Sequence, residues 1–181
     1  MKKILTLMLS LLLILSLSAC GSNQANEGKE KEENKQEANV EMDKKLTEMI
    51  EEITQGIELP DSAVYDLDDE LFEAYAFTKK EEGLEGVASE AQISTLAHSL
   101  VLIRSKDPNT EELAKNLSEN ANTRKWICVE AETGKVLYGD NYVFLVMTNE
   151  ASYEGLKANF EKVTGIKEAK VLNVEAKDPY Q

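Results

Sequence analysis

The spacing of apolar residues predicts that the folded part of the chain begins with an amphipathic helix. Leu46, Met49, Ile50 and Ile53 recur at intervals of three and four residues, which places them on one helical face. Gly56 follows, and glycine readily adopts the left-handed conformation that ends many helices. We therefore expect a first helix that stops at Gly56.

Later helices are predicted wherever a capping residue precedes helical spacing. The side chains of such residues accept hydrogen bonds from the first turn of the helix. The predicted caps are Asp68, then Asn109 or Thr110, then Thr148 or Asn149. Gly165 is predicted to end the last of these helices.

Alternation of apolar and polar residues predicts strands between the helices. Residues 85–94 and 97–105 alternate in this way, although a helix over residues 88–98 remains open because alanine, glutamate and glutamine suit helices. Residues 142–147 are almost continuously apolar and should form the central, best-buried strand. A further edge strand is predicted at residues 170–174.

Two turn sequences predict consecutive hairpins. Glu132–Lys135 has a glycine where a hairpin needs a positive φ, and Gly139–Asn141 forms the second turn. Trp126–Val129 is aromatic and β-branched, and predicts a strand before the first turn. Together the elements predict an α+β fold: an antiparallel sheet of about four to five strands with helices packed mainly on one face.

The most apolar run of the chain lies at its start, where Lys2 and Lys3 precede residues 4–18. This run is too short for a comfortable transmembrane helix, which needs about 20 apolar residues. A basic start, a short apolar core and a small-residue exit are typical of a secretory signal peptide. We therefore interpret residues 1–19 as a signal peptide.

The exit sequence, Leu17-Ser18-Ala19-Cys20, resembles the lipobox of bacterial lipoproteins. The resemblance implies cleavage between Ala19 and Cys20, a diacylglyceryl thioether on the Cys20 thiol, and acylation of the new amino-terminus. Two or more acyl chains give stable anchoring, at about 0.8 kcal/mol per buried methylene. The alternatives are an ordinary signal peptide with a coincidental cysteine and an uncleaved membrane anchor.

Residues 20–43 separate the lipidated cysteine from the predicted helices. This stretch mixes charges and lacks aromatic residues, so it cannot bury enough apolar surface to offset its ordering entropy. We interpret it as a flexible tether with a reach of roughly 25 Å, an extended helix being the alternative. Residues 44–181 are then expected to form a single α+β domain.

The charge balance excludes nucleic acid as an expected partner. The chain has 20 basic and 34 acidic residues and a formal charge of −14. Removal of residues 1–19 takes away two lysines, which leaves 18 basic residues and a charge of −16. Such a surface repels phosphates and anionic headgroups, so we expect the lipid to hold the protein to its membrane.

The candidate nucleophile and base are single residues. Once Cys20 carries lipid, Cys128 is the remaining thiol, and a lone cysteine in a strand is most often a small buried hydrophobe. A Cys128–His98 dyad is the catalytic alternative. His98 is the only histidine and zinc needs three or four ligands, so we interpret it as a structural or surface residue and expect neither metal nor cofactor.

Two polar stretches are candidates for binding. Asp66–Glu70 gathers four carboxylates, which suit Ca²⁺, but their spacing does not match an EF-hand loop. We interpret this stretch as a helix start within a solvated acidic cluster. We interpret Asp140–Asn141 as hairpin chemistry; a recognition surface with Tyr138 and Tyr142 is the alternative.

Several stretches resemble a domain-of-unknown-function family of Gram-positive membrane lipoproteins. Besides the lipobox, they are "MIEEI", "DLDDELFEAYAF", "LVLIRSKDPNTEELAKNL" and "GDNYVFLVMT". The similarity covers most of residues 46–163. The resemblance implies an anchored α+β domain and supplies no catalytic residue.

We therefore expect a lipoprotein of the cell membrane, facing the extracytoplasmic side, whose domain binds an envelope protein or a small ligand without catalysis. The alternatives are an accessory subunit of a membrane complex and an envelope enzyme without a recognisable motif. The binding hypothesis predicts a shaped patch or groove. The enzyme hypothesis predicts that His98, Cys128 or paired acids converge in a pocket.

Overall fold

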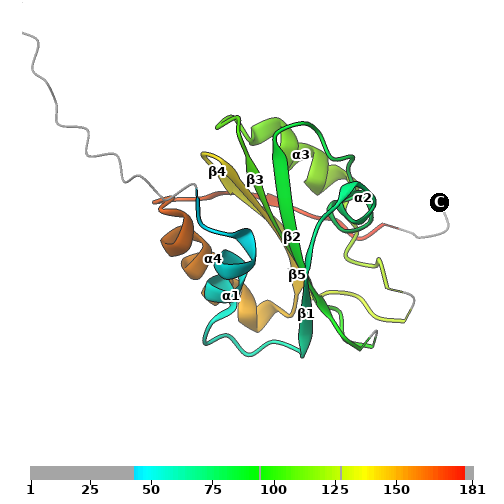
Figure 1. The fold of residues 1–181 in the computed structure, drawn as a ribbon. Helices are drawn as coiled ribbons and strands as arrows, with labels where there is room; N and C mark the ends of the chain where they lie inside the picture. The colour runs from blue at the N-terminus through cyan, green and yellow to red at the C-terminus, as the bar shows by residue number, and fades with distance from the viewer. Residues whose placement is uncertain (1–42, 94, 127, 178–181) are drawn as a thin grey trace, which may run out of the picture. The chain divides into compact units, whose positions relative to one another are not determined.

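The described part of the chain consists of one antiparallel sheet of six strands and four helices (Figure 1). The computed structural model describes residues 43–93, 95–126 and 128–177. The strands are β1 (Ser62–Asp66), β2 (Leu84–Ala91), β3 (Ser99–Ser105), β4 (Thr133–Gly139), β5 (Tyr142–Thr148) and β6 (Lys170–Asn173). The helices are α1 (Leu46–Thr54), α2 (Asp69–Ala76), α3 (Glu111–Asn120) and α4 (Glu150–Thr164).

The strand order across the sheet is β1-β2-β3-β5-β4-β6, and every neighbouring pair is antiparallel. Strands β3 and β5 occupy the centre, and every residue of β5 is buried, which confirms the predicted central strand. The β4–β5 hairpin closes with Gly139 opposite Tyr142, and Asp140 has a φ of 45° in the turn. The second predicted turn is therefore confirmed.

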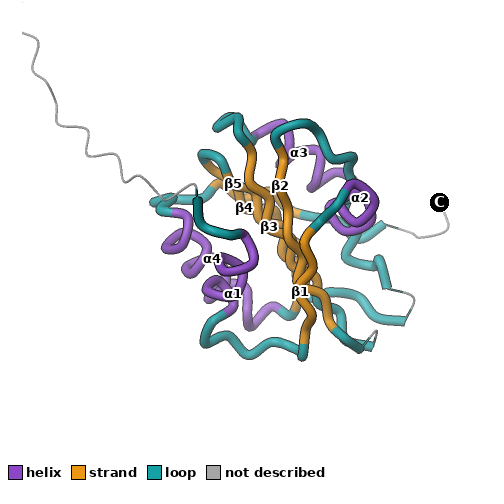
Figure 2. The backbone as a smooth tube through the Cα atoms, viewed as in Figure 1, coloured by secondary structure: helices purple, strands orange, loops and turns teal. Residues whose placement is uncertain are grey.

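Helices cover both faces of the sheet, so the expectation that they pack mainly on one face is wrong (Figure 2). Helices α1 and α4 cover one face, and α2 and α3 cover the other. In β3, Leu100 and Leu102 face α1 and α4, whereas Val101 and Ile103 face α2 and α3. A sheet whose central strands are apolar on both faces buries both of them.

The sheet also has six strands where about four to five were expected. The unexpected strand is β1, which is only five residues long and largely exposed, so it lacks a clear apolar alternation. Strand β2 resolves the alternative left open for residues 88–98, because the chain stays extended to Ala91 and then turns. Strand β6 confirms the edge strand predicted at residues 170–174.

Two predictions between residues 125 and 136 are wrong. Of the predicted strand at Trp126–Val129, the described residues Trp126, Cys128 and Val129 are not in a strand. The predicted turn at Glu132–Lys135 is wrong because Thr133, Gly134 and Lys135 begin β4. Gly134 serves close packing, because a Cβ there would lie 2.5 Å from Thr123 Cγ2 and 2.9 Å from Val174 Cβ.

The helix caps follow the sequence closely. The Asp68 side chain accepts a hydrogen bond from Leu71 N at 2.8 Å, and that of Asn149 accepts one from Ser152 N at 2.9 Å. Gly165 ends α4 with a φ of 76°. Thr110 precedes α3 as predicted, but its hydroxyl donates to Asp140 O at 3.1 Å and so joins the start of α3 to the β4–β5 turn.

Candidate functional site

The predicted cleavage and lipidation site at Ala19 and Cys20 lies outside the described residues, as does the predicted tether up to residue 42. Among residues 43–93, 95–126 and 128–177, no helix combines the length and the apolar character needed to cross a bilayer.

His98 and Cys128 do not form a dyad. His98 is fully buried, and its Nδ1 lies 3.0 Å from Thr148 Oγ1. Its Nε2 has no hydrogen-bond partner among the described residues. Burial, and secondarily the charge of Lys125, lowers the pKa of His98 to about 4, so the ring is neutral at pH 7. Cys128 is an exposed free thiol, which corrects the expectation that it is buried in a strand.

The acidic stretch Asp66–Glu70 forms the start of α2. Asp68 caps the helix, and Asp66, Asp69 and Glu70 are exposed, which confirms the interpretation as a helix start within solvated acids. In the described residues, no group of three histidine, cysteine, aspartate or glutamate side chains is arranged to hold a metal ion.

Asp140 and Asn141 form the turn of a hairpin, as interpreted from the sequence. Asn141 Nδ2 donates to Ser105 O at 2.8 Å, and Ser105 N donates to Asn141 O at 2.8 Å. Tyr138 and Tyr142 are both buried, at 7% and 2% exposure. The alternative of a recognition surface with these two tyrosines is therefore wrong.

A mostly buried ion pair lies on the sheet face that α2 covers. Lys125 Nζ donates to both carboxylate oxygens of Glu90 at 3.0 Å and to Ser99 Oγ at 2.9 Å. Ser99 Oγ in turn donates to Glu90 Oε1. The side chains of Lys125 and Glu90 are only 15% and 12% exposed. Sequence analysis did not identify this pair.

Three aromatic rings surround the ammonium group of Lys125. The Nζ atom lies 5.2 Å from the ring centre of Tyr75, 5.9 Å from that of Phe77 and 5.1 Å from that of Trp126. At such distances a cation is attracted to the ring face by about 0.5–2 kcal/mol. We call Lys125, Glu90, Ser99 and these three rings the Lys125 cluster.

Burial shifts the pKa of Glu90 and that of Lys125 in the direction that favours the neutral form of each side chain. It raises the pKa of Glu90 and lowers that of Lys125. The opposite charge of the partner works against both shifts, and the Ser99 hydroxyl also stabilises the Glu90 carboxylate. Each charge is therefore stabilised by the opposite charge of its partner.

The Lys125 cluster is not arranged for nucleophilic attack. A serine beside a lysine acts as a nucleophile when the lysine is neutral and the hydroxyl reaches the substrate. Glu90 favours the protonated form of Lys125, and Ser99 is fully buried. The geometry instead fixes a charged pair just beneath the surface.

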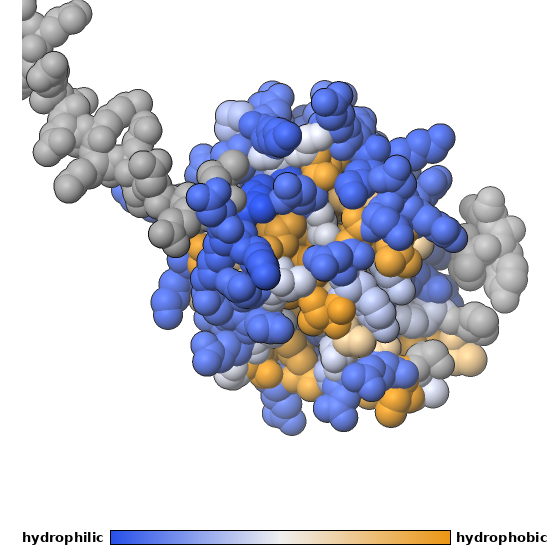
Figure 3. Space-filling view, viewed as in Figure 1, coloured by the Kyte–Doolittle hydropathy of each residue, from blue (hydrophilic) through white to orange (hydrophobic). Residues whose placement is uncertain are grey.

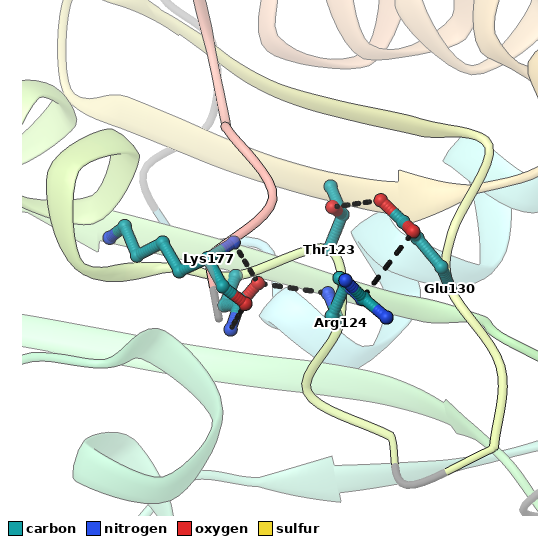
Figure 4. A network of polar contacts seen from close by, with 5 residues as sticks. Thr123, Arg124, Glu130 and Lys177 are labelled. Carbon is teal, nitrogen blue, oxygen red and sulfur yellow. Dashed lines mark hydrogen bonds and ion pairs between the residues drawn. The ribbon is translucent and has the colours of Figure 1, made fainter. Parts of the chain in front are cut away.

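A polar network holds the loop that carries Lys125 (Figure 4). Asn122 Nδ2 donates to Lys177 O at 3.1 Å, and Asn122 Oδ1 accepts from Lys177 N at 2.8 Å and from Arg124 N at 3.0 Å. Glu130 accepts from Thr123 Oγ1 at 3.1 Å and lies 3.6 Å from Arg124 Nε. The segment after β6 thereby fixes the loop between α3 and β4.

Among the described residues, four large apolar side chains are exposed on β1 and on the loop between β2 and β3, and Val171 of β6 is 38% exposed. The four are Val64, Tyr65, Ile93 and Leu96, with exposures of 40%, 42%, 57% and 45%. We call these four the apolar surface; in Figure 3, apolar side chains interrupt the hydrophilic surface around β1.

Two contacts connect the apolar surface to its surroundings. Gln92 N donates to Asp61 O at 2.9 Å and fastens the loop between β2 and β3 to the start of β1. Tyr65 stacks on Tyr75 of the Lys125 cluster, with ring centres 6.2 Å apart. The apolar surface therefore adjoins the Lys125 cluster.

A shallow groove of about 670 Å³ lies between residues 56–60 and the start of α4. Ser152 Oγ donates to Glu58 O at 3.0 Å. Ile57 packs against Gly155, where an added Cβ would lie 2.4 Å from Ile57 Cδ1. His98, Cys128 and the acids of 66–70 do not line the groove. The convergence that the enzyme hypothesis predicts is thus not found in this groove.

The family resemblance of the sequence stays a prediction after comparison with known proteins. Family models, curated proteins and solved structures were all compared with this chain, and none of them matches it.

Proposed function

We propose that this protein is a lipoprotein held to the extracytoplasmic side of the cell membrane by lipid on Cys20, and that its α+β domain is a non-enzymatic binding module for another envelope protein. The observation that carries the binding role is the apolar surface of Val64, Tyr65, Ile93 and Leu96. The lipobox-like sequence supports the anchor.

The apolar surface contrasts with the rest of a strongly acidic chain. Charged residues make up 30% of the sequence, so four large apolar side chains that remain 40–57% exposed on β1 and on the loop between β2 and β3 need a reason. Exposed apolar surface gathered in one region of a soluble domain is typical of an interaction site. Aromatic side chains such as Tyr65 are also enriched at such sites because they bury a large area with few rotatable bonds.

The surroundings of the apolar surface supply rigidity. Tyr65 stacks on Tyr75 of the Lys125 cluster, and the Asn122–Lys177 contacts fix the loop that carries Lys125. A surface that is already ordered loses less conformational entropy on binding, which leaves more of the interaction energy for affinity.

The anchor is tested by membrane fractionation of Cys20→Ala. We expect the variant to lose labelling by radioactive palmitate and to be released from the membrane. Cys128→Ala is the matched control, since it removes the other cysteine and should remain labelled and membrane-bound. A Cys20→Ala protein that stays labelled and cleaved like the wild type would contradict the anchor.

The binding role is tested by site-specific photo-crosslinking in intact cells. A photoreactive residue at Leu96, in the apolar surface, is expected to give one discrete crosslinked product. The same residue at Glu112, which is exposed on α3, is the control and should give none. Equal crosslinking at both positions, or none at Leu96, would remove the binding role from this surface.

A further inference from the structure

We propose that the free edge of β1 receives an extended, lysine- or arginine-bearing segment of the partner protein, which adds a seventh strand to the sheet. This inference rests on the proposed binding role and specifies the class of partner. It follows from the position of β1 in the sheet, from the direction of its backbone groups and from the charges around it.

Strand β1 ends the sheet in the described part of the chain. It pairs with β2 on one side, and the strand order begins with it. At the two ends of this pairing, Gln92 N donates to Asp61 O and Leu67 N donates to Gly86 O, both at 2.9 Å. Hydrogen-bonded and non-bonded pairs alternate in an antiparallel ladder. Ala63 and Tyr65 therefore direct their backbone groups toward β2.

The residues between them direct their backbone groups away from the sheet. Val64 and Asp66 thus offer N–H and C=O groups along the outer edge, in the pattern that an incoming strand requires. Successive side chains of a strand point to opposite faces, so Val64 and Tyr65 place exposed apolar surface on both sides of this edge. An added strand would cover both.

The opposite edge of the sheet is protected by charge. Strand β6 begins with the exposed Lys170, which lies 3.7 Å from Glu111 of α3. Edge strands that are not used for binding commonly carry lysine, because a charged side chain discourages pairing with another chain. Strand β1 has neither lysine nor proline within Ser62–Asp66.

The charges around β1 select the occupant. Residues 61–78 contain six acidic residues and no lysine or arginine. Asp61 and Asp66 are exposed at the two ends of the strand, and the acids at the start of α2 follow directly. Lys80 follows this stretch, and its ammonium group already donates to Leu67 O at 2.9 Å and lies 3.8 Å from Asp69. An extended segment that carries lysine or arginine would therefore meet opposite charge at Asp61 and Asp66, at the two ends of β1.

The same charges disfavour a second copy of this chain as the occupant. Antiparallel pairing of two β1 strands about Val64 would place Asp66 of each copy opposite Ser62 of the other, and Asp61 next to the other copy's Asp68. The two copies, each with a formal charge of −16 after removal of residues 1–19, would repel one another.

The test uses the full chain in nanodiscs of neutral lipid and a fluorescein-labelled synthetic peptide of alternating valine and lysine. Anisotropy should show saturable binding of this peptide and at least about tenfold weaker binding of a matched valine–glutamate peptide. Amide hydrogen exchange at Val64 and Asp66 should slow in the complex, because both N–H groups then face a new strand. Equal binding of the two peptides, or unchanged exchange at both amides, would overturn the proposal.

Val64→Pro removes the outward N–H of β1 and keeps the bonds to β2, and proline is tolerated at such an edge position. It should weaken binding of the lysine peptide at least about tenfold, whereas Glu112→Gln, at an exposed position of α3, should leave it within about twofold. If Val64→Pro does not fold, the double variant Asp61→Asn, Asp66→Asn tests the proposal instead. Its binding of the lysine peptide should be about threefold weaker or more, and unchanged binding would contradict the proposal.

The outcomes separate this inference from the proposed function. If Val64→Pro retains the crosslink from Leu96 and binds the lysine peptide like the wild type, the binding role stands and the strand addition falls. If Leu96 gives no crosslink in the wild type, the binding role itself falls. Sedimentation tests for a second copy as the occupant. A dimer in the wild type that is absent in Val64→Pro would show that a second copy pairs with β1, and would overturn the proposal of a cationic segment.

Discussion

Lys125 Nζ lies 3.0 Å from each carboxylate oxygen of Glu90, although 35 residues separate the two in the sequence. The pair joins the loop after α3 to β2. Glu90 is opposite Ala63 of β1 in the sheet register, so this contact also supports the strand whose outer edge is free. The ion pair therefore connects the interior of the domain to its proposed binding surface.

Removal of one partner should destabilise the domain strongly. Lys125→Met leaves the Glu90 carboxylate mostly buried without a counter-charge, and an unpaired buried charge costs about 3–5 kcal/mol. Urea unfolding at pH 7, followed by the fluorescence of the single tryptophan, Trp126, measures the free energy of unfolding. Glu90→Gln combined with Lys125→Met should recover part of the loss. Additive effects of the two changes would show that the pair is not coupled.

Acid should weaken the fold through His98. The pKa of His98 is about 4 in the folded chain and about 6.5 when unfolded, so the unfolded chain binds the proton more readily between these values. The His98 contribution is therefore complete above pH 6.5 and is lost as the pH falls toward 4. Between pH 7.5 and 5 we expect a loss of about 2 kcal/mol in unfolding free energy.

His98→Gln is the control for this pH dependence, because glutamine does not titrate. The raised pKa of Glu90 acts in the opposite direction, since protonation of a buried carboxyl favours the folded state as the pH falls. This contribution is common to both proteins. The difference between wild type and variant should therefore change by about 2 kcal/mol, and parallel pH profiles would contradict the assignment.

The helices and central strands could be predicted because their signals are local. The face of Leu46, Met49, Ile50 and Ile53 and the cap at Asn149 each depend on residues within a few positions of one another. The covering of both sheet faces by helices could also have been predicted from the sequence, because in β3 the apolar residues Leu100 and Leu102 alternate with the apolar residues Val101 and Ile103. Apolar residues on both faces of a strand indicate two covering layers.

The Lys125 cluster could not be predicted, because tertiary structure alone brings its members together. Glu90, Ser99 and Lys125 come from two strands and a loop, and no short motif connects them. Gly134 misled the prediction for a related reason. Glycine is typical of turns, but here it allows Thr123 and Val174 to approach the strand, and this contact is not visible in the sequence.

Gly134→Ala should destabilise the fold by about 1–3 kcal/mol, as expected when a side chain is added to a packed interior. The new Cβ would lie 2.5 Å from Thr123 Cγ2, so the loop after α3 has to move. Thr123→Ser removes this methyl group and keeps the hydroxyl that donates to Glu130. Thermal unfolding should show partial recovery in the double variant, and no recovery would mean that the clash with Val174 dominates.

Asn122 should control the mobility of the loop that carries Lys125 and Trp126. Asn122→Ala removes the bonds to both backbone groups of Lys177 and to Arg124 N, and each is worth about 0.5–1.5 kcal/mol. Asn122→Asp keeps the oxygen that accepts from Lys177 N and loses only the donation to Lys177 O, so its effect should be smaller. Amide hydrogen exchange at Lys177 should accelerate in the order wild type, Asn122→Asp, Asn122→Ala.

Asn116→Ala, on the exposed side of α3, is the matched control and should leave this exchange unchanged. Equal exchange in all four proteins would show that other contacts hold the loop, and the rigidity proposed for the binding surface would then need another source.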